Sequence, residues 1–222
     1  MFKTGVPFID LFSLIVVFLP LLPVIIILAR KIYQLDVLNF LMILCLINFI
    51  SGLNLQLLPV THTGRLGAAH VFSLLELVIL TQLFKSGLAR KYRELIDILT
   101  IAFLSAVITY YLLKGVDQHP VLLEETINGW IILSAALSLL QIVHRNYLRI
   151  FNSPLFWIAT GTLFYFVIAM LLELITATRL SLPQSITTEK TVLLNIAATT
   201  RYLFYTLAAW IYNRPTHSDQ QF

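Results

Sequence analysis

The chain has few charged residues, one cysteine and no familiar catalytic motif. Only 12% of its 222 residues are charged, whereas ordinary globular proteins have about 25%, and this shortage argues against a soluble domain. The single cysteine, Cys45, allows no intramolecular disulfide. The five histidines never occur as H-x-x-x-H or H-E-x-x-H, and the sequence has neither a G-x-S-x-G motif nor a P-loop. We therefore predict no metal site, no cofactor and no catalytic residues of a known motif.

Long apolar runs are what the sequence has in abundance. Hydrophobic residues make up 59% of the chain, and the mean hydropathy is +0.87. A transmembrane helix needs about 20 mostly apolar residues, and seven runs approach or reach that length. They predict an all-α integral membrane protein with a single domain, a seven-helix transmembrane bundle. The expected helices are Phe8–Leu28, Val37–Leu58, Gly67–Phe84, Leu95–Leu113, Thr126–Val143, Leu155–Thr176 and Thr191–Tyr212.

The basic residues predict the orientation of this bundle. Nine lysines and arginines fall in the odd-numbered loops and the C-terminal tail, and five fall in the even-numbered loops and the N-terminal segment. Cytoplasmic loops carry the excess of Lys and Arg, so we expect the N-terminus outside and the C-terminus in the cytoplasm. The net charge of +4 follows from this bias and requires no nucleic-acid partner. The partner we expect is the lipid bilayer, in a bacterial inner membrane.

Two opposite charges lie near the middle of apolar runs. Arg201 is central in the last run, and Glu76 is central in the third. A lone arginine at the bilayer centre costs roughly 2.5–3.5 kcal/mol on insertion scales, so we predict that Arg201 and Glu76 pair. Tyr205 follows Arg201 by four residues and shares its helix face. Two interpretations stay open: a buried structural lock between helices, or the lining of a ligand cavity or an ion path.

A second polar set falls in the expected outer halves of the helices. Polar residues facing lipid would each cost insertion energy, so we predict that they converge on a ligand-binding pocket open to the outside. Leu80, Leu83 and Leu207 are expected to close this pocket on the inner side. The simpler explanation is that the asparagines form hydrogen bonds between helices and the tryptophan is an interfacial anchor. The set comprises Asn54, His70, Asn128, Trp130, Glu173 and Asn195.

One segment resembles a known group of membrane proteins. Asn152-Ser153-Pro154-Leu155-Phe156-Trp157-Ile158, followed by Gly161 and Tyr165-Phe166, is similar to a segment of small seven-helix bacterial membrane proteins related to the sensor modules of membrane-bound histidine kinases. The resemblance implies a seven-helix fold and a sensory role. Because the sequence contains no kinase part, such a protein would need a cytoplasmic signalling partner.

Three functions compete on these observations. The first is a receptor-like sensor or accessory protein that binds a small or lipidic ligand and signals through a cytoplasmic partner. The second is a small-molecule or proton-coupled transporter using Glu76 and Glu173; however, Pro20 and Pro23 interrupt the first run without a counterpart in the fifth, so no inverted repeat is visible. The third is an intramembrane lipid hydrolase, similar in size and helix number to the lysoplasmalogenase-like enzymes. This sequence lacks the intramembrane aspartates that hydrolysis would require, which makes an enzyme the less expected function.

Overall fold

Every regular element that the structure describes is a helix. The structure is a computed structural model that describes residues 7–57, 62–114, 121–145, 150–177 and 184–212. The helices are α1 (Pro7–Phe18), α2 (Leu21–Ala29), α3 (Asp36–Leu57), α4 (His62–Gly87), α5 (Arg90–Lys114), α6 (Val121–Arg145), η1 (Ile150–Asn152), α7 (Pro154–Ala177) and α8 (Gln184–Ile211). The predicted all-α class is confirmed within these ranges.

Within the described ranges, six helical segments are long and apolar enough to cross a membrane. They are Pro7–Ala29, Asp36–Asn54, Ala68–Gly87, Arg90–Leu113, Leu123–His144 and Pro154–Thr176. The chain is therefore a multi-pass membrane protein. Asn195 and Arg201 lower the hydropathy of α8, which is not among the six.

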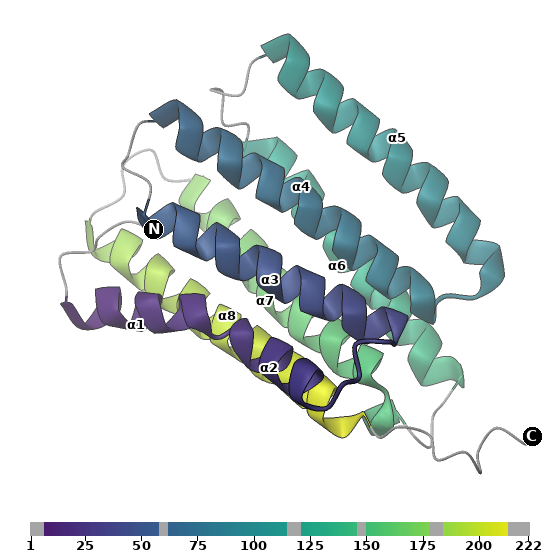
Figure 1. Cartoon of the computed structure of the whole chain (residues 1–222). Helices are drawn as coiled ribbons and strands as arrows, with labels where there is room; N and C mark the ends of the chain where they lie inside the picture. Colours follow the sequence, from purple (N-terminus) through teal and green to yellow (C-terminus); the bar gives the residue numbers. More distant parts are fainter. Residues whose placement is uncertain (1–6, 58–61, 115–120, 146–149, 178–183, 213–222) are drawn as a thin grey trace, which may run out of the picture.

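The helices form a ring with one helix outside it. The main contacts run from α2 to α3, α4, α6, α7 and α8, and back from α8 to α2. The chain skips α5 in this order, because α4 packs directly on α6. Figure 1 shows α5 at the edge of the bundle, and α4 is the helix it contacts most. Only 17% of the residues in the apolar segment of α5 are buried, the lowest share of the six segments.

The interior of the ring is filled by apolar side chains. Leu41 of α3, Leu77 of α4, Ile131 of α6 and Ile158 of α7 are each at most 1% exposed. Leu80 and Leu83, which we expected to close the inner half, are fully buried, while Leu207 is half-buried. Packing of this kind excludes water from the centre of the bundle.

Proline breaks the first spanning segment where the sequence predicts an interruption. Proline has no backbone N–H to donate to the preceding turn, and its ring clashes with the carbonyl four residues back. α1 ends at Phe18 and α2 begins at Leu21, so Pro20 lies at the break. Pro23 does not interrupt the helix, because it lies in the first turn of α2, where N–H groups have no partner within the helix.

Four helices begin five or more residues before their apolar runs. They are α4, at His62 rather than Gly67, α5, at Arg90 rather than Leu95, α6, at Val121 rather than Thr126, and α8, at Gln184 rather than Thr191. Glu124 and Glu125, which precede the expected start of the fifth helix, therefore lie on α6. Hydropathy marks the part of a helix that suits hydrocarbon, whereas a helix continues through polar turns wherever its backbone bonds are made.

The basic segment expected as the third loop is also mostly helical. Only Leu88 and Ala89 separate α4 from α5, so Arg90, Lys91 and Arg93 lie in the first turn of α5. Figure 1 shows this turn at the same end of the bundle as the C-terminal ends of α2, α6 and α8.

Helices α7 and α8 pack closely where Gly161 faces Phe204. A Cβ atom on Gly161 would lie 2.8 Å from Cβ of Phe204 and 3.2 Å from the carbonyl oxygen of Arg201. Trp157, one turn earlier on α7, stacks on Phe204 with ring centroids 5.6 Å apart. The glycine therefore lets the backbone of α7 approach the turn of α8 that carries Arg201.

Candidate functional site

Arg201 and Glu76 form an ion pair in the interior of the ring, as predicted. Nη2 of Arg201, on α8, lies 2.5 Å from Oε1 of Glu76, on α4. The side chain of Arg201 is 3% exposed and that of Glu76 is 19% exposed. The charge of each residue thus offsets most of the free-energy cost of burying the other charge.

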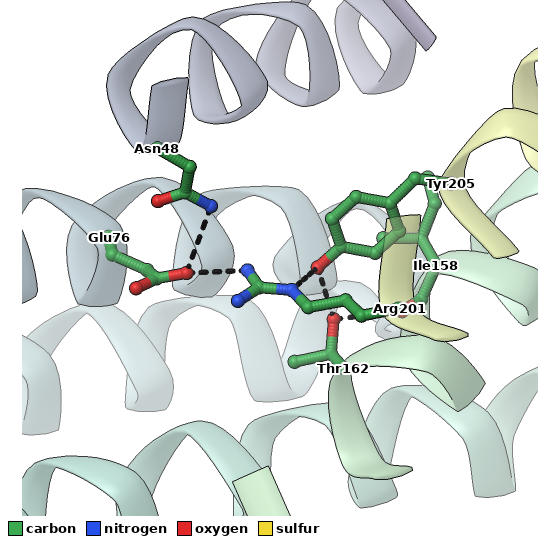
Figure 2. Close-up of polar contacts among 6 residues, drawn as sticks. All are labelled: Asn48, Glu76, Ile158, Thr162, Arg201 and Tyr205. Atoms are coloured by element: carbon green, nitrogen blue, oxygen red, sulfur yellow. Dashed lines mark hydrogen bonds and ion pairs between the residues drawn. The ribbon is translucent and has the colours of Figure 1, made fainter. Parts of the chain in front are cut away.

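A chain of hydrogen bonds continues from the arginine to α7. Nε of Arg201 donates to the hydroxyl oxygen of Tyr205 at 2.7 Å. The hydroxyl of Thr162 donates to the Ile158 carbonyl at 2.8 Å, so the Tyr205 hydroxyl is the donor in its 2.7 Å bond with Thr162. Figure 2 shows these side chains in line, with Asn48 of α3 beyond the carboxylate.

Asn48 completes the link to a fourth helix. Its Nδ2 donates to Oε1 of Glu76 at 3.3 Å, so one carboxylate oxygen receives both the amide and the guanidinium. We name the set Asn48, Glu76, Thr162, Arg201 and Tyr205 the central network. It joins α3, α4, α7 and α8.

Aromatic rings surround the guanidinium where hydrogen bonds do not reach. The guanidinium carbon lies 5.0–5.8 Å from the ring centroids of Tyr165, Phe166, Tyr202 and Tyr205. A cation over an aromatic face is stabilised by the ring quadrupole, most strongly when water is excluded. The rings therefore stabilise the positive charge of Arg201 without adding an anion to Glu76.

No family model, curated protein or solved structure matches this chain. The similarity of the Asn152–Phe166 segment to sensor modules stays an expectation.

The predicted outer polar residues have different neighbours. Nδ1 of His70 lies 3.0 Å from the hydroxyl oxygen of Tyr111 on α5. Asn195 donates to the hydroxyl of Ser13 on α1 at 2.7 Å, and Glu173 of α7 pairs with Lys190 of α8. The outward pocket that would unite them stays a prediction.

The remaining members of that set lie on α3 and α6. Asn54 and Asn128 are half-buried. Trp130 stacks on Phe103 of α5, with ring centroids 5.9 Å apart. Its Nε1 atom is buried and has no hydrogen-bond partner among the described residues.

Glu125 and Ser13 are among the buried polar groups that the sequence did not predict. Glu125, at the start of α6, is 8% exposed, and neither carboxylate oxygen has a hydrogen-bond partner within the described ranges. The second is Ser13, which binds Asn195 across α1 and α8. Within the same ranges no group of three His, Cys, Asp or Glu residues could hold a metal ion.

A crevice of about 540 Å³ lies between α5 and α6. Its α5 wall includes Tyr92, Leu95, Ile96 and Leu99, a spacing that places all four on one helix face. Its α6 wall runs from Trp130 to His144, which is about 21 Å along a helix. Of the predicted ligand-binding residues, Trp130 is the one that lines it. The periodicity of the sequence did not predict the crevice, because leucines that face lipid and leucines that face a crevice form the same pattern.

Proposed function

We propose that the chain is a receptor-like membrane protein, a sensor or accessory subunit, in which a lipidic ligand binds between α5 and α6 and displaces α5. The observation that carries this proposal is the crevice beside the least buried helix of the bundle. A helix with few buried contacts moves at a low free-energy cost. A cytoplasmic partner would detect the displacement at the exposed first turn of α5, which carries Arg90, Lys91 and Arg93.

We infer that α8 is a seventh spanning helix. Its 28 residues make a helix of about 42 Å, longer than the roughly 30 Å hydrocarbon core. It packs against α2 and α7, which both belong to candidate spans. Asn195 and Arg201 lower its hydropathy, yet both are at most 5% exposed and so do not face lipid.

With seven spans, the two termini lie on opposite sides of the membrane. The nine-to-five bias of basic residues supports a cytoplasmic C-terminus in a cell membrane. Reporter fusions after residue 88 and after residue 222 should both report cytoplasm. An exterior signal from the first would reverse the orientation, and opposite signals from the two would remove α8 from the set of spans.

Ligand binding in the crevice can be tested by saturable photolabelling. The purified protein, in lipid nanodiscs, would be labelled with a diazirine-bearing fatty acid, with and without excess unlabelled fatty acid. We expect competed label on Leu95, Leu99 and Leu137. Leu137→Trp, which fills the crevice, should abolish that component. Leu171→Trp, on the exposed face of α7, is the matched control and should leave it unchanged. Uniform label around the lipid-facing surface would refute the binding site.

Displacement of α5 needs a separate measurement. Spin labels at Ile101→Cys on α5 and Leu174→Cys on α7, in a Cys45→Ser background, give an interhelical distance; both sites are exposed. The fatty acid should lengthen or broaden this distance. An unchanged distance despite saturable labelling would make the crevice a structural lipid site and remove the sensory role.

The observations give less support to the two alternatives. A transporter needs a path through the ring, whereas Leu77, Leu80 and Leu83 fill it with side chains that are 0% exposed. The three acid–base candidates for a hydrolase, Glu76, Glu173 and His70, each contact another group. Glu76 pairs with Arg201, Glu173 pairs with Lys190, and His70 contacts the hydroxyl of Tyr111. Neither alternative has an observation of its own in its favour.

A further inference from the structure

We propose that the occupant of the α5–α6 crevice is an anionic glycerophospholipid of the surrounding bilayer. One acyl chain would lie in the crevice, and the phosphate would lie against the basic first turn of α5. This inference rests on the proposed function and names the chemical class of its ligand.

The walls of the crevice suit an acyl chain. Six of its lining residues are leucines or isoleucines from α5 and α6, and Leu88, from the connection before α5, is a seventh. The α6 wall is about 21 Å long, and one leaflet of a 30 Å hydrocarbon core is about 15 Å deep. A chain entering at one surface could therefore lie in the crevice for the full depth of its leaflet.

The polar end of the crevice carries positive charge. Tyr92 lines the crevice, and the ammonium of Lys91 lies 6.0 Å from the centroid of its ring. Arg93 donates to the carbonyls of Leu88, at 2.9 Å, and Ser86, at 3.1 Å, so its guanidinium is fixed beside the crevice lining. His144 lines the same end from α6.

The acidic residues near this end do not cancel its positive charge. Arg90 and Glu94 lie two residues on either side of Tyr92, which places both about 160° from it around α5, on the face away from the crevice, where their charges offset each other. Asp97 is paired with Lys85 of α4. Lys91 and Arg93, one residue on either side of Tyr92, are both exposed, so an anionic head group at the crevice would meet a net positive surface.

The two parts of the site make different contributions to binding. Burial of an acyl chain depends little on the head group, so the apolar walls would bind neutral and anionic lipids alike. Each lysine or arginine near a membrane surface favours anionic lipid by roughly fivefold. The basic turn would therefore supply the selectivity, and the crevice the position.

Native mass spectrometry of the purified full chain can measure this selectivity. The probes are phosphatidylglycerol and phosphatidylcholine with identical acyl chains, titrated against wild type and variants. We expect tighter binding of phosphatidylglycerol. The variant Lys91→Gln, which removes the charge beside the lining residue Tyr92, should reduce that preference about fivefold without changing phosphatidylcholine binding. Lys31→Gln, which removes an exposed charge just after α2 at the same end of the bundle (Figure 1), is the matched control and should change neither.

The variant Leu137→Trp separates failure of this inference from failure of the proposed function. The wild type could bind the two lipids with equal affinity while the variant loses binding of both. This result would refute the charge selectivity and leave a lipid site without head-group preference. Unchanged binding of both lipids in that variant would refute the crevice itself. An equal effect of Lys31→Gln and Lys91→Gln would show attraction to the basic end as a whole and overturn the assigned site.

Discussion

The central network predicts strong, non-additive coupling between Glu76 and Arg201. Glu76→Gln leaves a guanidinium that is 3% exposed and cannot lose its charge. Breaking one partner of a buried pair costs about 3–5 kcal/mol in soluble proteins, and we expect a loss of that size in the free energy of unfolding. The four surrounding rings reduce the loss but supply no negative charge.

The opposite substitution should cost less. Arg201→Met keeps a long apolar stem, and the carboxyl group of Glu76, which is more exposed than the guanidinium, keeps its bond with Asn48. In the double variant neither buried charge remains. Its stability should therefore exceed that of Glu76→Gln alone, which is the opposite of additive behaviour.

The assay is reversible unfolding of the purified protein in mixed micelles, with increasing denaturing detergent. The matched control is the Lys85–Asp97 pair, whose side chains are 25% and 33% exposed. More exposed pairs couple by about 1 kcal/mol or less, so a cycle of Lys85→Met and Asp97→Asn should be nearly additive. Additive losses at Glu76 and Arg201 as well would refute the reasoning that burial makes the pair interdependent.

Two further predictions use the same unfolding assay. Gly161→Ala should lower the free energy of unfolding by about 1–3 kcal/mol, because its new methyl group would overlap Phe204. Gly129→Ala, with no atom within 4 Å of the new methyl, should be neutral or raise it by up to about 1 kcal/mol, and a loss equal to that of Gly161→Ala would contradict the packing argument. Glu125→Gln should leave stability unchanged or raise it, because the buried carboxyl has no partner among the described residues. Glu173→Gln removes an ion pair and should lower the free energy of unfolding by about 1 kcal/mol or less. A larger loss for Glu125→Gln than for Glu173→Gln would contradict the burial argument.

The ion pair was predictable because physics leaves few choices for a charge at mid-depth. Arg201 and Glu76 lie near the centres of apolar runs, and each needs an opposite charge. Tyr205 followed from its four-residue spacing on the same helix. The prediction needed no information about which helices are neighbours.

Asn48 and Thr162 were not predictable, because their residue types carry little information in a membrane helix. Thr162 donates to the carbonyl four residues before it, as Thr199 and Thr206 also do. Only its additional bond to Tyr205 places it in the central network, and that bond depends on how α7 packs against α8. Tertiary packing, rather than local pattern, selects one threonine from several equivalent ones.

The crevice was hidden from the sequence for the same reason. Leu95, Ile96 and Leu99 form an apolar face on α5, and an apolar face suits lipid, a neighbouring helix or a bound acyl chain equally well. What creates the crevice is the order of contacts around the ring, in which α4 meets α6 directly and α5 is left outside. That order is a property of the folded bundle.

Helix α4 contributes to the central network and also contacts α5, and this decides which part of the bundle is able to move. α4 carries Glu76 and is also the principal neighbour of α5. A ligand shifts a conformational equilibrium only through contacts that differ between the two states. Arg201 is held by Glu76, Tyr205 and four aromatic rings, so a state that moved α4 away from α8 would leave a buried charge without compensation. Movement of α5 breaks none of these contacts. We therefore infer that the central network fixes the ring as a rigid frame, against which α5 changes its position when lipid enters the crevice.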